Sequence, residues 1–319
     1  MTSFVSEHVD RIQTALASPE ASHSALVASW RRSSSAHHLN PAEYRSPSRL
    51  TDRELQLARE ASGPLLDLAQ PSLDRLFQAV GAAGCSVLLA DKHGVALDRR
   101  GFGADDKTFE SWGLWKGAIW SEESEGTNGI GTCIVEQRTL TIHRDQHFYA
   151  RNALMSCTTA PIFNHVGELA AVLDVSSCRA DLVEGISGLV TIAASDAARR
   201  IEAENFKACY ATARIILPNT PNSSALLAVD ADDLVIGANR AARHGFGIDQ
   251  AMINRGVPVQ HFLKELSDTA LSLQNAERGA IQRALAEVDG NVSAAAKTLG
   301  ISRATLHRKM KRLSLSSNR

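Results

Sequence analysis

The chain is poor in aromatic residues, in paired cysteines and in long apolar runs. Aromatic residues make up 5% of its 319 residues, and its five cysteines are scattered with no C-x-x-C pair. This scatter argues against a zinc finger or ribbon and favours the reduced thiols of the cytosol. No apolar run approaches the ~20 residues that span a bilayer. Because Met1 to Asp10 is polar, we also expect no signal peptide and predict a cytoplasmic protein.

Motifs of nucleotide and metal chemistry are also missing. The sequence contains no G-x-x-x-x-G-K-[ST] phosphate loop. We find no ordered Ser/His/Asp set and no carboxylate pair that favours catalysis, so we expect neither an enzyme nor a cofactor. His143 and His147 are four residues apart, but the first is expected to end a strand. A metal shared by them would need a continuous helix, and we therefore expect no metal site.

The charge of the chain is unevenly placed. The formal net charge is −1, yet residues 277–319 hold nine Lys and Arg against three acids. This tail is therefore +6 and the remainder −7. A basic tail on a mildly acidic body is typical of a single nucleic-acid-binding module.

The basic tail has the spacing of three short helices. Helices are expected at about 276–288, 292–299 and from Ser302, which would cap the third helix. Leu306, Met310 and Leu313 would then face inward. A short basic helix after a glycine turn is what a helix-turn-helix places in the DNA major groove, with Arg303 near its N-terminal end reading base edges. The candidate DNA-contacting residues are Ser302, Arg303, Thr305, His307, Arg308, Lys309, Lys311 and Arg312.

The rest of the chain combines helices with an antiparallel sheet. Residues 1–80 read as helices, with Thr51 as a cap, Glu54 at the capping-box position, and breaks near Gly63–Pro64 and at Pro71. Strands are expected at 85–90, 95–97, 139–142, 155–163 and 168–175, and a long helix at 181–209. Asp174 is expected at a strand end. The Gly126–Gly129 run favours a helix start over a phosphate cradle.

Two stretches resemble known families. The tail resembles the Fis-type helix-turn-helix, GN-x-x-x-A-A-x-x-L-G-I-S-R-x-T-L, from Gly290 to Leu306, with His307 where an aromatic residue is usual. WKGAIWSEESEGTNGIGTCIVE (115–136), MSCTTAPIFNHVGEL (155–169) and AVLDVS (171–176) resemble the GAF sensor domain of AcoR-like regulators of acetoin and glycerol catabolism. Those regulators also carry an S-W-x-R-S run, which is Ser29 to Ser33 here.

The resemblance implies four segments of an α+β chain. They are an N-terminal helical element (1–80), a GAF sensor (81–208), a partial PAS-like segment or linker (209–265) and a Fis-type helix-turn-helix (270–319). The PAS-like reading rests on Ser224 to Ile248, with Asp230 to Asp233 as a turn. Relatives with this layout carry an AAA+ ATPase that engages sigma-54. With about thirty residues between Ile248 and the tail, this chain is expected to lack it.

A GAF sheet with a helical cover can hold a small molecule in a mostly apolar pocket. Three of the four tryptophans fall within residues 112–120, either as a wall of that pocket or as a core plug. Cys133 and Cys157 could sense redox state, although no pattern lowers their thiol pKa. The candidate effector-binding residues are Trp112, Trp115, Trp120, His143, His147, Phe148, Cys157 and Thr159.

These features predict a transcription regulator controlled by a small organic effector. It would bind a palindromic operator in double-stranded DNA as a homodimer, because one recognition helix buries too little surface for specificity. It would act without ATP hydrolysis, by recruiting or blocking RNA polymerase, and without a membrane. The alternatives are a constitutive DNA-binding or antagonist protein with a degenerate sensor and, least favoured, an enzyme fused to a DNA-binding module.

Overall fold

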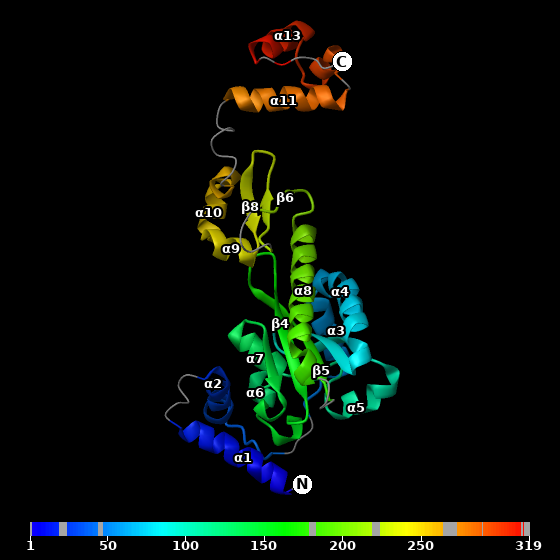
Figure 1. Cartoon of the computed structure of the whole chain (residues 1–319), viewed down its shortest axis with the longest axis vertical. Coiled ribbons are helices and arrows are strands. Elements are labelled where there is room, and N and C mark those ends of the chain that lie inside the picture. Colours follow the sequence, from blue (N-terminus) through cyan, green and yellow to red (C-terminus); the bar gives the residue numbers. More distant parts are fainter. Residues whose placement is uncertain are drawn as a thin grey trace.

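A computed structural model describes residues 2–18, 24–43, 47–178, 183–218, 224–263, 273–288, 290–313 and 315. Two antiparallel sheets and many helices make it a mixed α+β structure, as predicted. Helices α1 and α2 lie at one end of the chain's long axis, and α11 and α13 lie at the other (Figure 1). Asp289, expected in the turn after the first tail helix, lies outside the described residues.

The N-terminal helices confirm most of the expected boundaries. They are α1 (Thr2–Ala17), α2 (Ala25–Arg31), α3 (Asp52–Ala61) and α4 (Pro64–Val80). Thr51 and Glu54 form the predicted capping box at the start of α3. Gly63, with φ of +52°, separates α3 from α4. The predicted break at Pro71 is wrong, because α4 continues through Pro71 and its apolar face packs against the sheet.

A five-stranded antiparallel sheet forms the centre of the structure, and its strands match the predicted positions. The strands are β1 (Cys85–Asp91), β2 (Ala96–Arg100), β3 (Leu140–His143), β4 (Ser156–Phe163) and β5 (Leu169–Ser177). Their order is β2-β1-β5-β4-β3. Asp174 does not end a strand as expected. It lies inside β5, opposite Leu88 on one side and Thr159 on the other.

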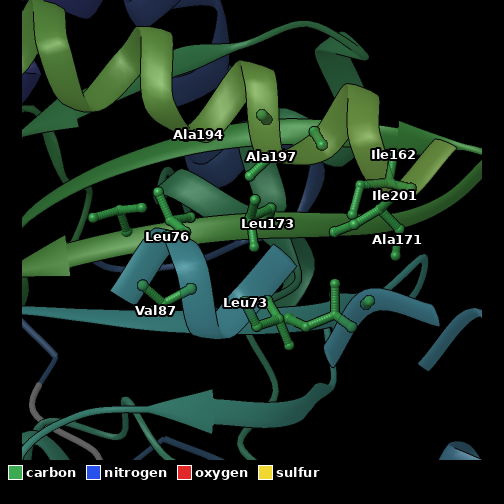
Figure 2. Close-up of a cluster of buried hydrophobic side chains, with 14 of the residues drawn as sticks. Leu73, Leu76, Val87, Ile162, Ala171, Leu173, Ala194, Ala197 and Ile201 are labelled. Atoms are coloured by element: carbon green, nitrogen blue, oxygen red, sulfur yellow. The ribbon is translucent and has the colours of Figure 1, made fainter. Parts of the chain in front are cut away.

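Alternate residues of these strands face two separate cores, because side chains alternate along a strand. On the first face, Leu173 and Ile162 pack against α4 and against Ala197 and Ile201 of α8 (Val183–Cys209) (Figure 2). We call this side the α8 face. The opposite side, which holds Val172 and Cys157, is the α7 face. Helices α5 (Asp106–Ser111), α6 (Glu122–Glu125) and α7 (Gly129–Glu136) lie on that side.

The segment expected to be a partial PAS-like unit or a linker is folded. It has the predicted strand, turn, strand and helix in a four-stranded antiparallel sheet with its own apolar core. Its elements are β6 (Arg214–Ile216), β7 (Leu227–Val229), β8 (Leu234–Ala238), α9 (Arg240–Phe246), α10 (Gln250–Arg255) and β9 (Val257–Pro258). Tyr210 follows α8 and packs so closely on Gly237 that an added Cβ would lie 2.2 Å from its ring.

The three tail helices are present where the sequence predicted them. They are α11 (Leu273–Glu287), α12 (Val292–Thr298) and α13 (Arg303–Arg312). Leu306 and Met310 are buried against α11 and α12, and Leu313 closes the same core, as expected. Gly300, with φ of +65°, makes the turn before α13. Across the described parts of the chain, we find no helix with the length and hydropathy to span a membrane.

Candidate functional sites

Helix α13 presents a basic outer face. The Ser302 hydroxyl accepts a hydrogen bond from the backbone N–H of Thr305 at 3.1 Å and lies 2.8 Å from the Thr305 hydroxyl, which fixes the start of the helix. Thr305 is thereby half-buried, whereas the other candidate side chains of this face are exposed. The exposed ones are Arg303, His307, Arg308 and Lys311.

Two of the predicted DNA-contacting cations bind a carboxylate of the same domain. Lys309 and Arg312 both pair with Glu277 of α11. The hydrogen bond from Lys309 and the nearby Arg312 guanidinium lower the pKa of Glu277 below its ordinary value. We call these three residues the Glu277 clamp. It ties the flank of α13 to α11, so the outer face is the part of α13 whose cations have no acidic partner among the described residues.

The α7 face contains a line of buried polar side chains. His147 Nε2 lies 3.4 Å from Cys157 Sγ, and Cys157 Sγ lies 3.1 Å from the Ser176 hydroxyl. Ser176 Oγ is 2.6 Å from Asp174 Oδ2, to which it donates. The other oxygen of Asp174, Oδ1, has no hydrogen-bond partner among the described residues. We call these four residues the buried polar line.

Burial favours the uncharged forms of the titratable members of this line. It raises the pKa of Asp174 to about 7 and lowers the pKa of His147 to about 4. Burial also raises the pKa of the Cys157 thiol well above its ordinary value, and that of Cys133 to about 12. A redox sensor needs an accessible thiolate, so these two thiols lack the chemistry of the redox role considered from sequence.

The start of α7 closes over the buried polar line. Asn128 caps α7 by accepting from the Gly131 N–H at 2.8 Å, which confirms Gly126–Gly129 as a helix start. A Cβ on Gly129 would lie 2.6 Å from the Cβ of Cys157. Only glycine therefore fits there without displacing β4.

The structure brings some of the candidate effector residues together. His147, Cys157 and Thr159 lie around the start of α7, with the Thr159 hydroxyl donating to the Gly129 carbonyl at 3.2 Å. Trp120 is buried in the apolar cluster of the α7 face, which also includes Cys157, and its indole N–H donates to the Gly113 carbonyl at 2.9 Å. Trp112 packs against that cluster from its edge.

Three candidates lie apart from this group. Trp115 lies under the Arg99 guanidinium, 4.5 Å from its ring centre. His143 is on the edge strand β3, where its Nδ1 is 2.7 Å from the Ser156 hydroxyl. Phe148 packs with apolar residues of α1 and α2 rather than with the other candidates.

A cavity of about 190 Å³ lies beside the α7 face at its β3 edge. Its walls include Leu140 and Ile142 of β3, Thr132 of α7 and Leu26 of α2. Ile142 pairs directly with Cys157 across β3 and β4. The cavity is therefore one strand away from the buried polar line.

The S-W-x-R-S run joins the N-terminal helices to the cover of the α7 face. Arg32 binds Glu122 of α6 at 2.8 Å and Glu136 of α7 at 3.2 Å. The Ser29 hydroxyl donates to Glu122 and lies 2.7 Å from the Thr127 hydroxyl. We call Ser29, Arg32, Glu122 and Thr127 the N-terminal latch. The run was visible in the sequence, but its partners, which lie 90 to 104 residues further along the chain, were not.

Comparison with known families fits this architecture. The family described as GAF domain matches residues 64–201. The family described as bacterial regulatory protein, Fis family, matches residues 272–313. The chain thus combines a GAF domain with a Fis-type helix-turn-helix, the class of protein that its sheet and its basic tail define.

Curated regulators are similar to this chain over more than half of its length. The chain is 31% identical to the acetoin catabolism regulatory protein of Cupriavidus necator over 252 residues, which cover 74% of this chain and 38% of that protein. It is 29% identical to the acetoin dehydrogenase operon transcriptional activator AcoR of Bacillus subtilis, over 56% of this chain and 30% of the relative. The chain is homologous to these regulators and spans about a third of their length.

One solved structure shares much of this fold. A chain of the Escherichia coli DhaR(N)–DhaL complex superposes with a TM-score of 0.52 at 15% identity. The match covers 76% of this chain and 86% of that chain. At this identity the likeness shows a common fold alone.

Proposed function

We propose that this protein is a sequence-specific DNA-binding transcription regulator whose GAF domain binds a small organic effector. The observation that carries the proposal is the outer face of α13, which offers Arg303, His307, Arg308 and Lys311 on a capped helix. Its relatives are transcription regulators with the same Fis-type module. A helix of this kind enters the major groove with its N-terminal residues on base edges.

The outer face divides into base-reading and phosphate-binding positions. Arg303 is the first residue of α13 and is exposed, which suits a base contact. Arg308 is more than one turn further along, where phosphates are met. Arg303→Ala should therefore relax base preference, and Arg308→Ala should weaken binding to all sequences and reduce the salt slope by about 1. Equal, uniform losses from both variants would contradict this division.

The effector site that we propose is the cavity beside the α7 face together with the buried polar line. Buried polar groups almost always have a hydrogen-bond partner, and Asp174 Oδ1 has none among the described residues. A hydroxyl or carbonyl compound entering from the cavity would supply one after a small shift of α7. The N-terminal latch would report that shift, because its Arg32 binds Glu122 of α6 and also Glu136 of α7.

Dimerisation would place two recognition helices on one operator. Helix α8 packs one side on the sheet and exposes Leu189 (68%) and Ile192 (60%) on the other. Two such helices from two copies would bury this stripe. The dimer would bind half-sites about one DNA turn, ~34 Å, apart.

The regulator would act by its position on DNA rather than by ATP hydrolysis. The matched GAF and Fis-type segments are separated by residues 202–271, and the described part of this interval holds the small second sheet. Regulation would then proceed by recruiting or blocking RNA polymerase. An effector can shift such a switch only as far as it binds the two states differently.

DNA binding by the full chain tests the proposal. Fluorescence anisotropy with the DNA upstream of its own gene would be measured across a salt series, with acetoin-like, diol and aromatic compounds. Tight specific binding that one compound shifts would support a ligand-controlled regulator. Weak binding that salt abolishes on every sequence would contradict sequence-specific recognition.

The tight closure of α7 over Cys157 favours a second candidate function. In that case the sensor is degenerate and the protein is a constitutive DNA-binding or antagonist protein. A thermal shift with the active compound separates the two, with Asp174→Asn as the variant because it keeps the size of the side chain. A shift that the variant loses supports the effector site, whereas specific DNA binding that no compound changes supports the constitutive protein.

A further inference from the structure

A larger cavity lies at the rim of the α8 face, away from the proposed effector site. Its volume is about 470 Å³. Four chain segments line it: the end of α3 and start of α4, the β1–β2 turn, the β4–β5 turn and the last turns of α8. The candidate effector residues and DNA-contacting residues named above all lie outside this lining.

Two carboxylates of this cavity each have an oxygen to spare. Asp91 Oδ1 accepts from the backbone N–H groups of His93 and Val95, both at 2.9 Å, whereas no described residue donates to its Oδ2. The Glu168 carboxylate accepts from the Asn164 amide through Oε2 at 3.4 Å, and its Oε1 accepts from none of the residues that the structure describes. A ligand with N–H donors could therefore bind both carboxylates.

Asn205 adds a buried amide to the two carboxylates. It lines the cavity from α8 and is more than nine-tenths buried, at 8% exposure. Its side chain nevertheless makes no hydrogen bond to any residue within the described ranges. Because buried polar groups almost always have a hydrogen-bond partner, the amide of Asn205 is a second observation that points to a ligand here.

The sheet directs Asp91 toward the same side as α8. Asp91 is opposite Ala171 in the pairing of β1 with β5, and directly opposite residues project to the same face of a sheet. Ala171 belongs to the core of the α8 face. The Asp91 carboxylate and the Asn205 amide therefore reach the cavity from two of its walls, the sheet and the helix.

The side chains of the lining carry more negative than positive formal charge. Asp91 and Glu168 are opposed by one lysine, Lys92, which is exposed on the β1–β2 turn. Two imidazoles complete the polar lining. That of His93 is exposed on the same turn, and that of His165 lies edge-on to the ring of Tyr210, with centres 5.8 Å apart.

Two helix ends add to this negative charge. The last turns of α3 and α8 both line the cavity, and the C-terminal end of a helix carries a partial negative charge that favours a cation. The start of α4 also borders the cavity, but its first residue, Pro64, has no N–H to offer to an anion. Side chains and helix ends together favour a positively charged ligand.

The remaining wall of the cavity is apolar, which suits an organic ligand better than a bare metal ion. The residues of this wall are Ala58, Leu65, Ala170 and Ala208. A primary ammonium group has three N–H donors, as many as the acceptors that Asp91, Glu168 and Asn205 offer.

We propose that this cavity is a second small-molecule site that binds an alkylammonium ion. The ammonium group would donate to Asp91, Glu168 and Asn205, and the alkyl part would pack on the apolar wall. The ligand would thereby join the two turns to the end of α8, where Tyr210 packs on Gly237 of the second sheet.

Cys209 gives a direct measure of occupancy. It lines the cavity and is the exposed member of the five free cysteines, whereas Cys178 is partly exposed and does not line the cavity. Alkylation of both thiols of the full chain by iodoacetamide would be followed by peptide mass spectrometry. Butylammonium chloride is the probe. Butan-1-ol is its uncharged counterpart, sodium butyrate its anionic one, and sodium chloride controls for ionic strength.

Butylammonium is expected to slow alkylation of Cys209 about tenfold at ten times its dissociation constant and to leave Cys178 unchanged. Asp91→Asn removes the charge but keeps the oxygen that accepts from the turn, and it should lose the protection. Glu168→Gln should lose it as well. Glu168 is on an exposed turn, so its variant tests the site even if Asp91→Asn fails to fold.

Glu204→Gln is the matched control. It removes an exposed carboxylate of α8 directly before Asn205, and it should keep the protection because Glu204 does not line the cavity. The proposal is overturned if butylammonium protects no more than sodium chloride, if butan-1-ol or butyrate protects equally, or if a folded Asp91→Asn or Glu168→Gln variant keeps full protection.

Discussion

Removal of Arg32 tests the N-terminal latch. The Glu122 side chain is 2% exposed and that of Arg32 is 30% exposed. In Arg32→Ala the Glu122 carboxylate would stay buried with only the hydroxyls of Ser29 and Thr132 as donors. Loss of one partner of a buried ion pair costs about 3–5 kcal/mol, and we expect about 3 kcal/mol because Arg32 is partly solvated. For a domain of this size the melting temperature would fall by about 6–12 °C.

Urea unfolding, followed by tryptophan fluorescence, measures this loss. Arg31→Ala is the matched control, because Arg31 is the exposed last residue of α2, directly before Arg32, and its loss should cost less than about 0.5 kcal/mol. Adding Glu122→Gln to Arg32→Ala should restore at least about 1 kcal/mol, since no buried charge is then left without a partner. Equal losses in Arg31→Ala and Arg32→Ala would refute the latch.

Three further predictions concern other parts of the chain. Glu277→Gln should free Lys309 and Arg312 for phosphates and steepen the salt dependence of DNA binding by up to about 2 in slope, measured by anisotropy; an unchanged slope would contradict it. Because Asp174 has a pKa of about 7 when folded, the folded state holds a proton that the unfolded state has lost, and stability falls as pH rises from about 4 to 7. Asp174→Asn should remove this fall, so that between pH 5 and 7 the free energy of unfolding of the variant, measured in urea, rises by about 2 kcal/mol relative to that of the unsubstituted protein. Parallel pH profiles of the two proteins would contradict this. Ile192→Lys should give a monomer in sedimentation without loss of helix content, and a dimer of unchanged affinity would exclude the α8 stripe as the interface.

The elements that follow from local patterns were predictable. The positions of β1, β4 and β5, the capping box at Thr51 and the turn at Gly300 all follow from neighbouring residues. The break expected at Pro71 failed for a tertiary reason. The packing of α4 on the sheet stabilises the helix enough to tolerate a proline inside it.

The sites were less predictable because they depend on long-range contacts. Cys157 and Ser176 meet because β4 and β5 pair in one register, which no local pattern determines. From the sequence, Asp174 is expected at the end of a strand because carboxylates are rare inside buried strands. The Glu277 clamp was equally hard to predict from the sequence, because Lys309 and Glu277 are on different helices and meet only once the three tail helices pack.

The alternation of the central strands has a consequence for how such a protein can evolve. Cys157 and Thr159 face α7, whereas Ala160 and Ile162, their neighbours on β4, hold the core under α8. In the effector site that we propose, substitutions at the first set would change what is recognised, while the second set would continue to secure the fold. Ligand preference and stability would then be encoded by different residues of the same strands. Selection can therefore act on one with little cost to the other.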